Sequence, residues 1–139
     1  MGHWVKLNYE RQEYIIDLDR ISAFALAANG RVTLWLPDSS IPLIFSDQAE
    51  PNEYYKILNY IDKITAHPSN EMWMWMECDR QEYIINLHRI SSFCHAGHKI
   101  MFWLPDSGID ITLTQQSNPE AYQTLQDFIH RTTGESFSE

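Results

Sequence analysis

Two stretches of this chain recur almost unchanged. Residues 11–16 read Arg-Gln-Glu-Tyr-Ile-Ile and return as residues 80–85, and Trp-Leu-Pro-Asp-Ser occupies both 35–39 and 103–107. Arg-Ile-Ser likewise stands at 20–22 and at 89–91. Self-similarity of this kind indicates a tandem duplication, so each half should fold as one copy of the same unit. We predict a first repeat over 1–65, a linker over 66–70, a second repeat over 71–133 and a frayed tail over 134–139.

Alternation of apolar and polar residues predicts the strands of each repeat. In the first repeat the expected runs are 4–9, 13–24 with a bend at Asp19-Arg20, 31–36 and 40–45. Their counterparts begin at Met72, Glu82, Ile100 and Gly108. Asn29-Gly30 supplies residues that tolerate positive φ in a hairpin turn, and each Pro-Asp-Ser supplies a type I turn.

One amphipathic helix should close each repeat. Apolar residues recur at helical spacing after Pro51 and again after Pro119. Asn118 is expected to cap the second helix, with Pro119 at its first position, and Glu50 is a weaker cap for the first.

The expected fold is therefore α+β, a tandem duplication of a ββββα unit. We predict antiparallel sheets with two helices packed on one face, a shared core and a pseudo-two-fold axis, because one helix and four short strands make a poor core alone. A continuous eight-stranded curved sheet is favoured over two smaller sheets packed face to face. Tandem units of this kind occur in saddle-shaped DNA-binding proteins, but the charge of this chain argues against that analogy.

Composition argues against several classes of function. The formal net charge of −9 over 139 residues predicts repulsion of nucleic acid and of acidic membrane surfaces. The start of the chain lacks the pattern of a signal peptide, and no apolar stretch is long enough to span a bilayer. Cys78 and Cys94 are expected to be reduced thiols in a cytoplasmic protein. No phosphate-cradle, dinucleotide or nucleophile-elbow motif is present, so neither a cofactor nor enzymatic activity is expected.

The tryptophans are the main functional indication in the sequence. All five fall in the strand phase opposite to Val5, Leu7, Val32, Leu34 and Leu36, which the helices should cover. Such a face can be buried between the repeats, form a homodimer interface, or bind another protein or a small molecule. We favour a small binding or assembly protein, a homodimer or an adaptor, that acts through this face. The residues concerned are Trp4, Trp35, Trp73, Trp75 and Trp103.

A Cys/His cluster in the second repeat suggests an alternative. Imidazole and thiolate are ligands of zinc and related metals, and Cys94, His95 and His98 lie close together in sequence, with Cys78 and His88 upstream. Adjacent strand residues point to opposite faces, however, and no paired-cysteine spacing is present. A structural role is favoured over a metal-binding or small-molecule-binding site.

Two repeated polar patterns are assigned structural roles. Arg20 and Arg89 are expected to pair with Asp38 and Asp106 across a bend, with anion capture as the functional alternative. The Arg-Gln-Glu segments, with Glu13 and Glu82, are interpreted as surface ion pairs beside turns rather than as catalytic carboxylates.

Overall fold

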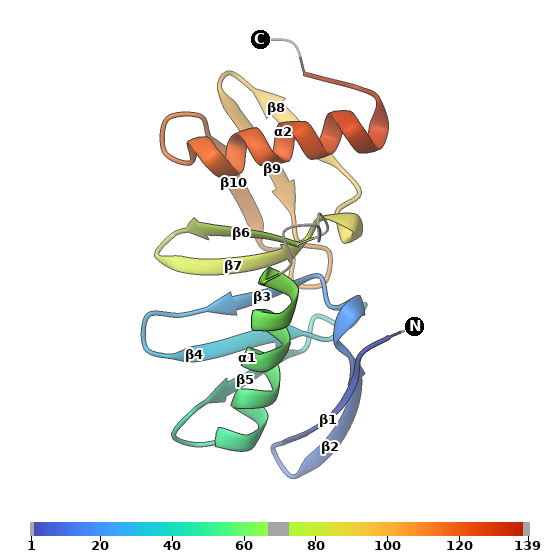
Figure 1. Cartoon of the computed structure of the whole chain (residues 1–139), viewed down its shortest axis with the longest axis vertical. Helices are drawn as coiled ribbons and strands as arrows, with labels where there is room; N and C mark the ends of the chain where they lie inside the picture. The colour runs from blue at the N-terminus through green and yellow to red at the C-terminus, as the bar shows by residue number, and fades with distance from the viewer. Residues whose placement is uncertain (1, 67–72, 138–139) are drawn as a thin grey trace.

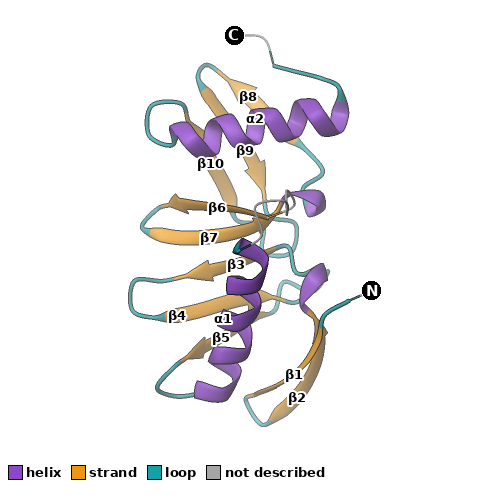
Figure 2. Ribbon diagram, viewed as in Figure 1, coloured by secondary structure: helices purple, strands orange, loops and turns teal. Residues whose placement is uncertain are grey.

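A computed structural model describes residues 2–66 and 73–137 of the chain. The same order of elements, ββηβββα, occurs twice (Figures 1 and 2). The first half contains β1 (Trp4–Tyr9), β2 (Gln12–Asp17), the 3₁₀ helix η1 (Leu18–Arg20), β3 (Ala23–Leu26), β4 (Arg31–Trp35), β5 (Pro42–Ser46) and α1 (Pro51–Thr65). The second half contains β6 (Trp73–Cys78), β7 (Gln81–Asn86), η2 (Leu87–Arg89), β8 (Phe93–Ala96), β9 (Lys99–Trp103), β10 (Asp110–Thr114) and α2 (Pro119–Thr133).

The bend expected at Asp19-Arg20 is a turn of 3₁₀ helix, and it divides one predicted strand into two. The carboxylate of Asp17 accepts a hydrogen bond from the backbone N–H of Asp19, and Asn86 accepts one from His88 in the second half. These short polar side chains cap the turn, so each half has five strands rather than the four predicted.

Both helices begin at the predicted prolines, but neither start is capped as expected. Asn118 and Glu50 occupy the N-cap positions, yet neither side chain bonds to its own helix. Asn118 donates instead to the carbonyl of Glu77, and Glu50 accepts from the backbone N–H of Ser46. The two side chains therefore tie each helix start to a strand end.

The strands of the described residues form three antiparallel sheets rather than one continuous sheet. β1 and β2 form a hairpin sheet, β5-β4-β3-β7-β6 form a five-stranded sheet, and β10-β9-β8 form a three-stranded sheet. The α+β class and antiparallel pairing are confirmed. The single eight-stranded sheet was wrong, because η1 and η2 each break the chain between a hairpin and the three strands that follow.

The two helices lie in separate cores on opposite sides of the five-stranded sheet. Neighbouring residues Ile84 and Ile85 of β7 are both fully buried, Ile84 in a core with α1 and Ile85 in a core with α2. Adjacent strand residues point to opposite faces, so β7 is covered on both faces. The expectation that both helices cover one face is therefore corrected.

The repeats are joined by pairing between β3 of the first and β7 of the second. Phe24 lies opposite Ile84 and Ala25 lies opposite Tyr83. A two-fold relation would require the corresponding strands, β8 and β2, to pair as well, and they lie in different sheets. The junction is thus heterologous and open rather than the predicted pseudo-two-fold.

Two predictions concern residues at or beyond the ends of the described ranges, namely the linker and the C-terminal tail. Met72 and most of the predicted linker, including His67 and Pro68, lie outside the described residues. In the tail, Phe137 stacks on the ring of His95 with centroids 5.0 Å apart and packs against the α2 core. No helix in the described ranges is long and apolar enough to cross a membrane.

Candidate functional site

One edge of the molecule is made almost entirely of turns. In the five-stranded sheet, Arg31 lies opposite Ser46, Leu26 opposite Glu82, and Cys78 opposite Gln81, so these strand ends share an edge. The hydrogen bond from Asn118 to Glu77 brings the start of α2 to the same edge. We call this region the turn edge; in Figure 1 most of its turns lie at the left, with the β8–β9 turn at the top and the β1–β2 turn at the bottom. It comprises the turns at 10–11, 27–30, 47–50, 79–80, 97–98 and 115–118.

Two arginines on the turn edge have unusual backbone conformations. Arg11 and Arg80 have φ of 65° and 67°, and the acidic residues before them, Glu10 and Asp79, also have positive φ. Two consecutive positive φ values define the type I′ turn, which favours Asn-Gly because other side chains are strained there. The fold therefore presents an arginine at the same strained position in both hairpins.

The two turns at the upper end of the turn edge contain no acidic residue, and Glu77, Glu82 and Glu120 line a hollow beside Asn118. The upper end is formed by the β8–β9 turn and the segment after β10, which are joined by a hydrogen bond from the backbone N–H of Gln115 to the carbonyl of His98. Its exposed polar side chains are His98, Lys99, Gln115, Gln116 and Ser117. We call this surface the second-repeat tip. The corresponding turns of the first repeat contain Arg31 but also Asp47 and Glu50.

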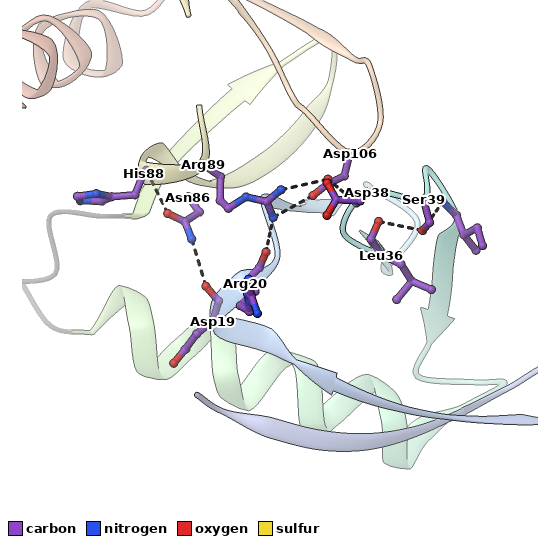
Figure 3. Close-up of polar contacts among 10 residues, drawn as sticks. Asp19, Arg20, Leu36, Asp38, Ser39, Asn86, His88, Arg89 and Asp106 are labelled. Atoms are coloured by element: carbon purple, nitrogen blue, oxygen red, sulfur yellow. Dashed lines mark hydrogen bonds and ion pairs between the residues drawn. The ribbon is translucent and has the colours of Figure 1, made fainter. Parts of the chain in front are cut away.

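The opposite edge holds a polar network between the repeats (Figure 3). The carboxylate of Asp106 is buried, and its two oxygens lie 3.2 Å from the guanidinium nitrogens of Arg89. Asp106 also accepts a hydrogen bond of 2.9 Å from the backbone N–H of Asp38, and Arg89 donates to the carbonyl of Arg20. This network fixes both repeats at one point.

The predicted pairing of arginine with aspartate holds in the second repeat only. Arg89 pairs with Asp106 as expected. Arg20 and Asp38 are exposed, and within the described residues neither takes part in an ion pair. A hollow of about 590 Å³ lies beside them, between β2, the β4–β5 turn and η2.

A buried tyrosine lies close to this edge. The hydroxyl of Tyr60 on α1 donates a hydrogen bond of 2.5 Å to the carboxylate of Asp19. Burial, and then this hydrogen bond and the negative charge of Asp19, raise the pKa of Tyr60 above its usual value of 10.0. The tyrosine therefore stays neutral and anchors η1 to α1.

The structure does not bring the five tryptophans together on one face. Trp4, Trp75 and Trp103 are exposed and lie on three different sheets. Trp73 packs against the rings of Phe24 and Tyr60, and Trp35 packs against the α2 core. The five side chains therefore do not form one continuous apolar face.

The Cys/His cluster is also dispersed. No group of three or more His, Cys, Asp or Glu side chains in the described part of the chain could hold a metal ion. His95 lies 3.3 Å from the hydroxyl of Tyr122 and stacks on Phe137, whereas Cys94 is exposed. Cys78 is half-buried, and burial raises the pKa of its thiol.

The Arg-Gln-Glu segments do not form the expected internal ion pairs. Glu13 lies 3.9 Å from Lys6 on the neighbouring strand, and both side chains are largely exposed. An exposed pair of this kind contributes little to stability.

Comparison with known proteins reveals a likeness in architecture. No family model matches the chain, and no curated protein matches its sequence. Among solved structures, the LytTr DNA-binding domain of a response regulator from Bacillus cereus superposes with a TM-score of 0.50 and 10% sequence identity. The match covers 91% of this chain and 95% of that domain. The chain has a LytTr-like fold.

This likeness contradicts two of the interpretations made from sequence. The structural neighbour is a DNA-binding domain, which conflicts with the exclusion of nucleic acid and with a non-enzymatic protein-assembly function as a homodimer or an adaptor. The exclusion rested on net charge, and net charge averages over the whole surface. Binding of DNA depends on the charges at the contact surface.

Sequence reasoning missed the turn edge. Arg31 was expected to begin a strand, and Arg80 belongs to a segment interpreted as a surface ion pair. Lys99, Gln115 and Gln116 were assigned no function. The available signal was the repeated arginine in a two-residue hairpin turn, where Gly or Asn is expected.

Proposed function

We propose that this chain is a DNA-binding domain that contacts DNA through the turn edge. The observation that carries the proposal is the LytTr-like fold, which extends over 91% of this chain and 95% of a DNA-binding domain. Fold alone does not define a binding surface, so the surface is inferred from the charges and conformations of the turns.

Cations on the turn edge support its assignment as the phosphate-binding surface. Arg11, Arg31, Arg80 and Lys99 lie in or beside four different turns along this edge, and all four are exposed. Two of them occupy the strained type I′ positions. Strain retained at an exposed turn is characteristic of a residue held for its function, and arginine is suited to phosphate.

The second-repeat tip is the best candidate for reading bases. Lys99 provides a cation there, and no carboxylate lies in its two turns. Gln115 and Gln116 present exposed amides, and a glutamine amide can pair with both the N6 and N7 positions of adenine in the major groove. His98 adds a further hydrogen-bonding group.

The acidic remainder of the surface favours one orientation on DNA. With a net charge of −9, most faces of the protein repel phosphate, and the second-repeat tip, whose two turns contain no carboxylate, should repel it least. Few phosphate contacts are available, so we expect modest affinity with a shallow dependence on salt, about −3 in log K against log salt for three contacts.

The test is fluorescence anisotropy with a pool of random-sequence duplexes at low salt. We compare the wild type with the triple variant Arg31→Ala, Arg80→Ala, Lys99→Ala. A control triple variant, Arg20→Ala, Lys56→Ala, Lys63→Ala, removes the same charge from η1 and α1, away from the turn edge.

The proposal predicts binding by the wild type and at least a tenfold loss in the turn-edge variant, with a smaller loss in the control. The salt slope should fall to about −1 only in the turn-edge variant, which retains Arg11. Absence of binding by the wild type at low salt, or equal losses in both variants, would contradict the proposal.

A further inference from the structure

The clearest unexplained feature of the molecule is that two identical hairpin segments have different surroundings. Tyr-Ile-Ile occurs at 14–16 in β2 and at 83–85 in β7. Ile84 is fully buried opposite Phe24 of β3, whereas its counterpart Ile15 is 67% exposed. The difference arises because β7 pairs with β3 on its second edge, while β2 has no described strand there.

The β1–β2 hairpin therefore carries the same docking face as the β6–β7 hairpin, but without a partner. In β6, Trp73 packs against Phe24 and Tyr60 of the first repeat. Its counterpart Trp4 is 63% exposed beside Ile15, and both line the hollow of about 590 Å³. Two large apolar side chains are thus exposed at positions where the other repeat buries Ile84 and partly buries Trp73.

The matching acceptor lies at the other end of the molecule. β8 corresponds to β3, and β9 is its single described neighbour. The residues that correspond to Phe24 and Tyr60 are Phe93 and Phe128, and they line a hollow of about 320 Å³ next to β8. In the first repeat the equivalent space is occupied by Trp73. Phe137 lines one wall of the second hollow.

We propose that the β1–β2 hairpin of one molecule docks on the free edge of β8 of a second copy, repeating the junction seen inside the chain. Applied to the new contact, the internal register places Phe93 opposite Ile15 and Cys94 opposite Tyr14. Trp4 then fills the hollow beside Phe93 and Phe128. This contact joins two different surfaces, so it produces open head-to-tail chains, unlike a closed homodimer formed through a sheet face.

The polar groups at the free site are also those of the internal junction. Inside the chain, Arg89 is paired with Asp106 and donates to the carbonyl of Arg20. At the free site, the counterparts Arg20 and Asp38 are both exposed. In the assembled form they would pair, and Arg20 would donate to the carbonyl of Arg89 of the second copy. One group differs: Asp17 stands in place of Asn86 and cannot donate the bond that Asn86 makes to the carbonyl of Asp19.

A disulfide trap tests the register directly, because Cys94 is already present and exposed. Tyr14→Cys should place a second thiol opposite Cys94 of another copy, within reach of a disulfide. Mild oxidation of Tyr14→Cys should give a ladder of reducible dimers and higher species on non-reducing gels. The ladder should be absent in Tyr14→Cys with Cys94→Ser. It should also be absent in Glu13→Cys, in which the thiol points to the opposite face of the strand.

Other cross-linking patterns would overturn the proposal. Disulfide dimers in the wild type, or in Tyr14→Cys with Cys94→Ser, would show that cross-linking does not require residues 14 and 94 to lie opposite each other. Absence of any ladder at millimolar protein, in a Tyr14→Cys variant with a wild-type circular dichroism spectrum, would also refute it.

Light scattering provides a second, independent measurement without cysteine chemistry. The weight-average molar mass of the wild type should rise above 16.4 kDa with concentration, and Ile15→Arg should hold it at 16.4 kDa. Ile44→Arg, a matched change at another exposed isoleucine, should still associate. A wild type that stays at 16.4 kDa, or equal behaviour of the two variants, would contradict the proposal. Neither measurement involves DNA, so a negative result would refute the proposed self-association without bearing on the proposed DNA binding.

Discussion

The two repeats share much of their sequence but differ in what covers them. The second repeat buries Ile84 and Asp106 because β3 and the β4–β5 turn of the first repeat lie against it. The counterparts Ile15 and Asp38 are exposed. Burial at these positions is therefore determined by the neighbouring repeat and not by local sequence.

The largest difference should appear when the two equivalent isoleucines are truncated. Ile84→Ala removes buried methyl groups from the core with α1 and should lower the free energy of unfolding by about 3 kcal/mol. Ile15→Ala, at an exposed position, should change it by less than about 0.5 kcal/mol. Urea denaturation of dilute protein measures both, and similar effects would show that the two hairpins are covered alike.

Removal of the equivalent arginines should give the next largest contrast. Arg89→Met leaves the buried carboxylate of Asp106 without its cation, which should cost about 3 kcal/mol of folding free energy. Arg20→Met removes an exposed guanidinium and should cost less than about 0.5 kcal/mol. Urea denaturation compares the two variants. A larger loss of folding free energy in Arg20→Met than in Arg89→Met would contradict the assignment of Arg89 to the junction between the repeats.

Much of the fold could be predicted from the sequence because strands and helices are local. The strand runs, the bend at Asp19 and both helix starts follow from alternation, turn residues and prolines. The arrangement of sheets could not be predicted in this way. Residues 14–16 and 83–85 are identical, so no local pattern could distinguish an exposed Ile15 from an Ile84 that is buried in a core of the other repeat.

The candidate site was predictable to a smaller extent. The ion pair between Arg89 and Asp106 could be predicted from the charges of the two side chains. The same reasoning also predicted an ion pair between Arg20 and Asp38, which does not form, because the sequence does not show which repeat is covered by the other. The turn edge depends on how strand ends from both repeats meet. Net charge, on which the exclusion of nucleic acid mainly rested, does not contain that information.

Alkaline pH should distinguish the two helices. Because the pKa of Tyr60 is raised, the tyrosine hydroxyl holds its proton more tightly in the folded state than in the unfolded state. The protonated Tyr60 therefore contributes its full stabilisation of the fold below pH 10, and this contribution declines as the pH rises above 10. At about pH 11 the loss should be about 1 kcal/mol. The corresponding residue of α2 is Phe128, which does not ionise. Thermal melts should show that Tyr60→Phe flattens this alkaline loss; an unchanged pH dependence in the variant would contradict the role of Tyr60.

Glycine substitutions in the two strained turns should have similar effects on stability, and these are the smallest effects that we expect. Arg11→Gly and Arg80→Gly each relieve positive φ at a non-glycine residue and should stabilise the protein by about 0.5–1 kcal/mol. Under the proposed function each should also weaken DNA binding. Destabilisation by either change, seen in thermal melts, would show that the arginine is held by contacts rather than strained.

The most direct test of the proposed DNA-binding surface is a titration of ¹⁵N-labelled protein with a duplex, followed amide by amide in ¹H–¹⁵N spectra. The account predicts shifts concentrated in the turns at 10–11, 27–31, 79–80, 97–99 and 115–118, with the amides of η1, η2 and the β4–β5 turn unchanged. Shifts confined to the junction edge, or no shifts at any DNA concentration, would contradict it.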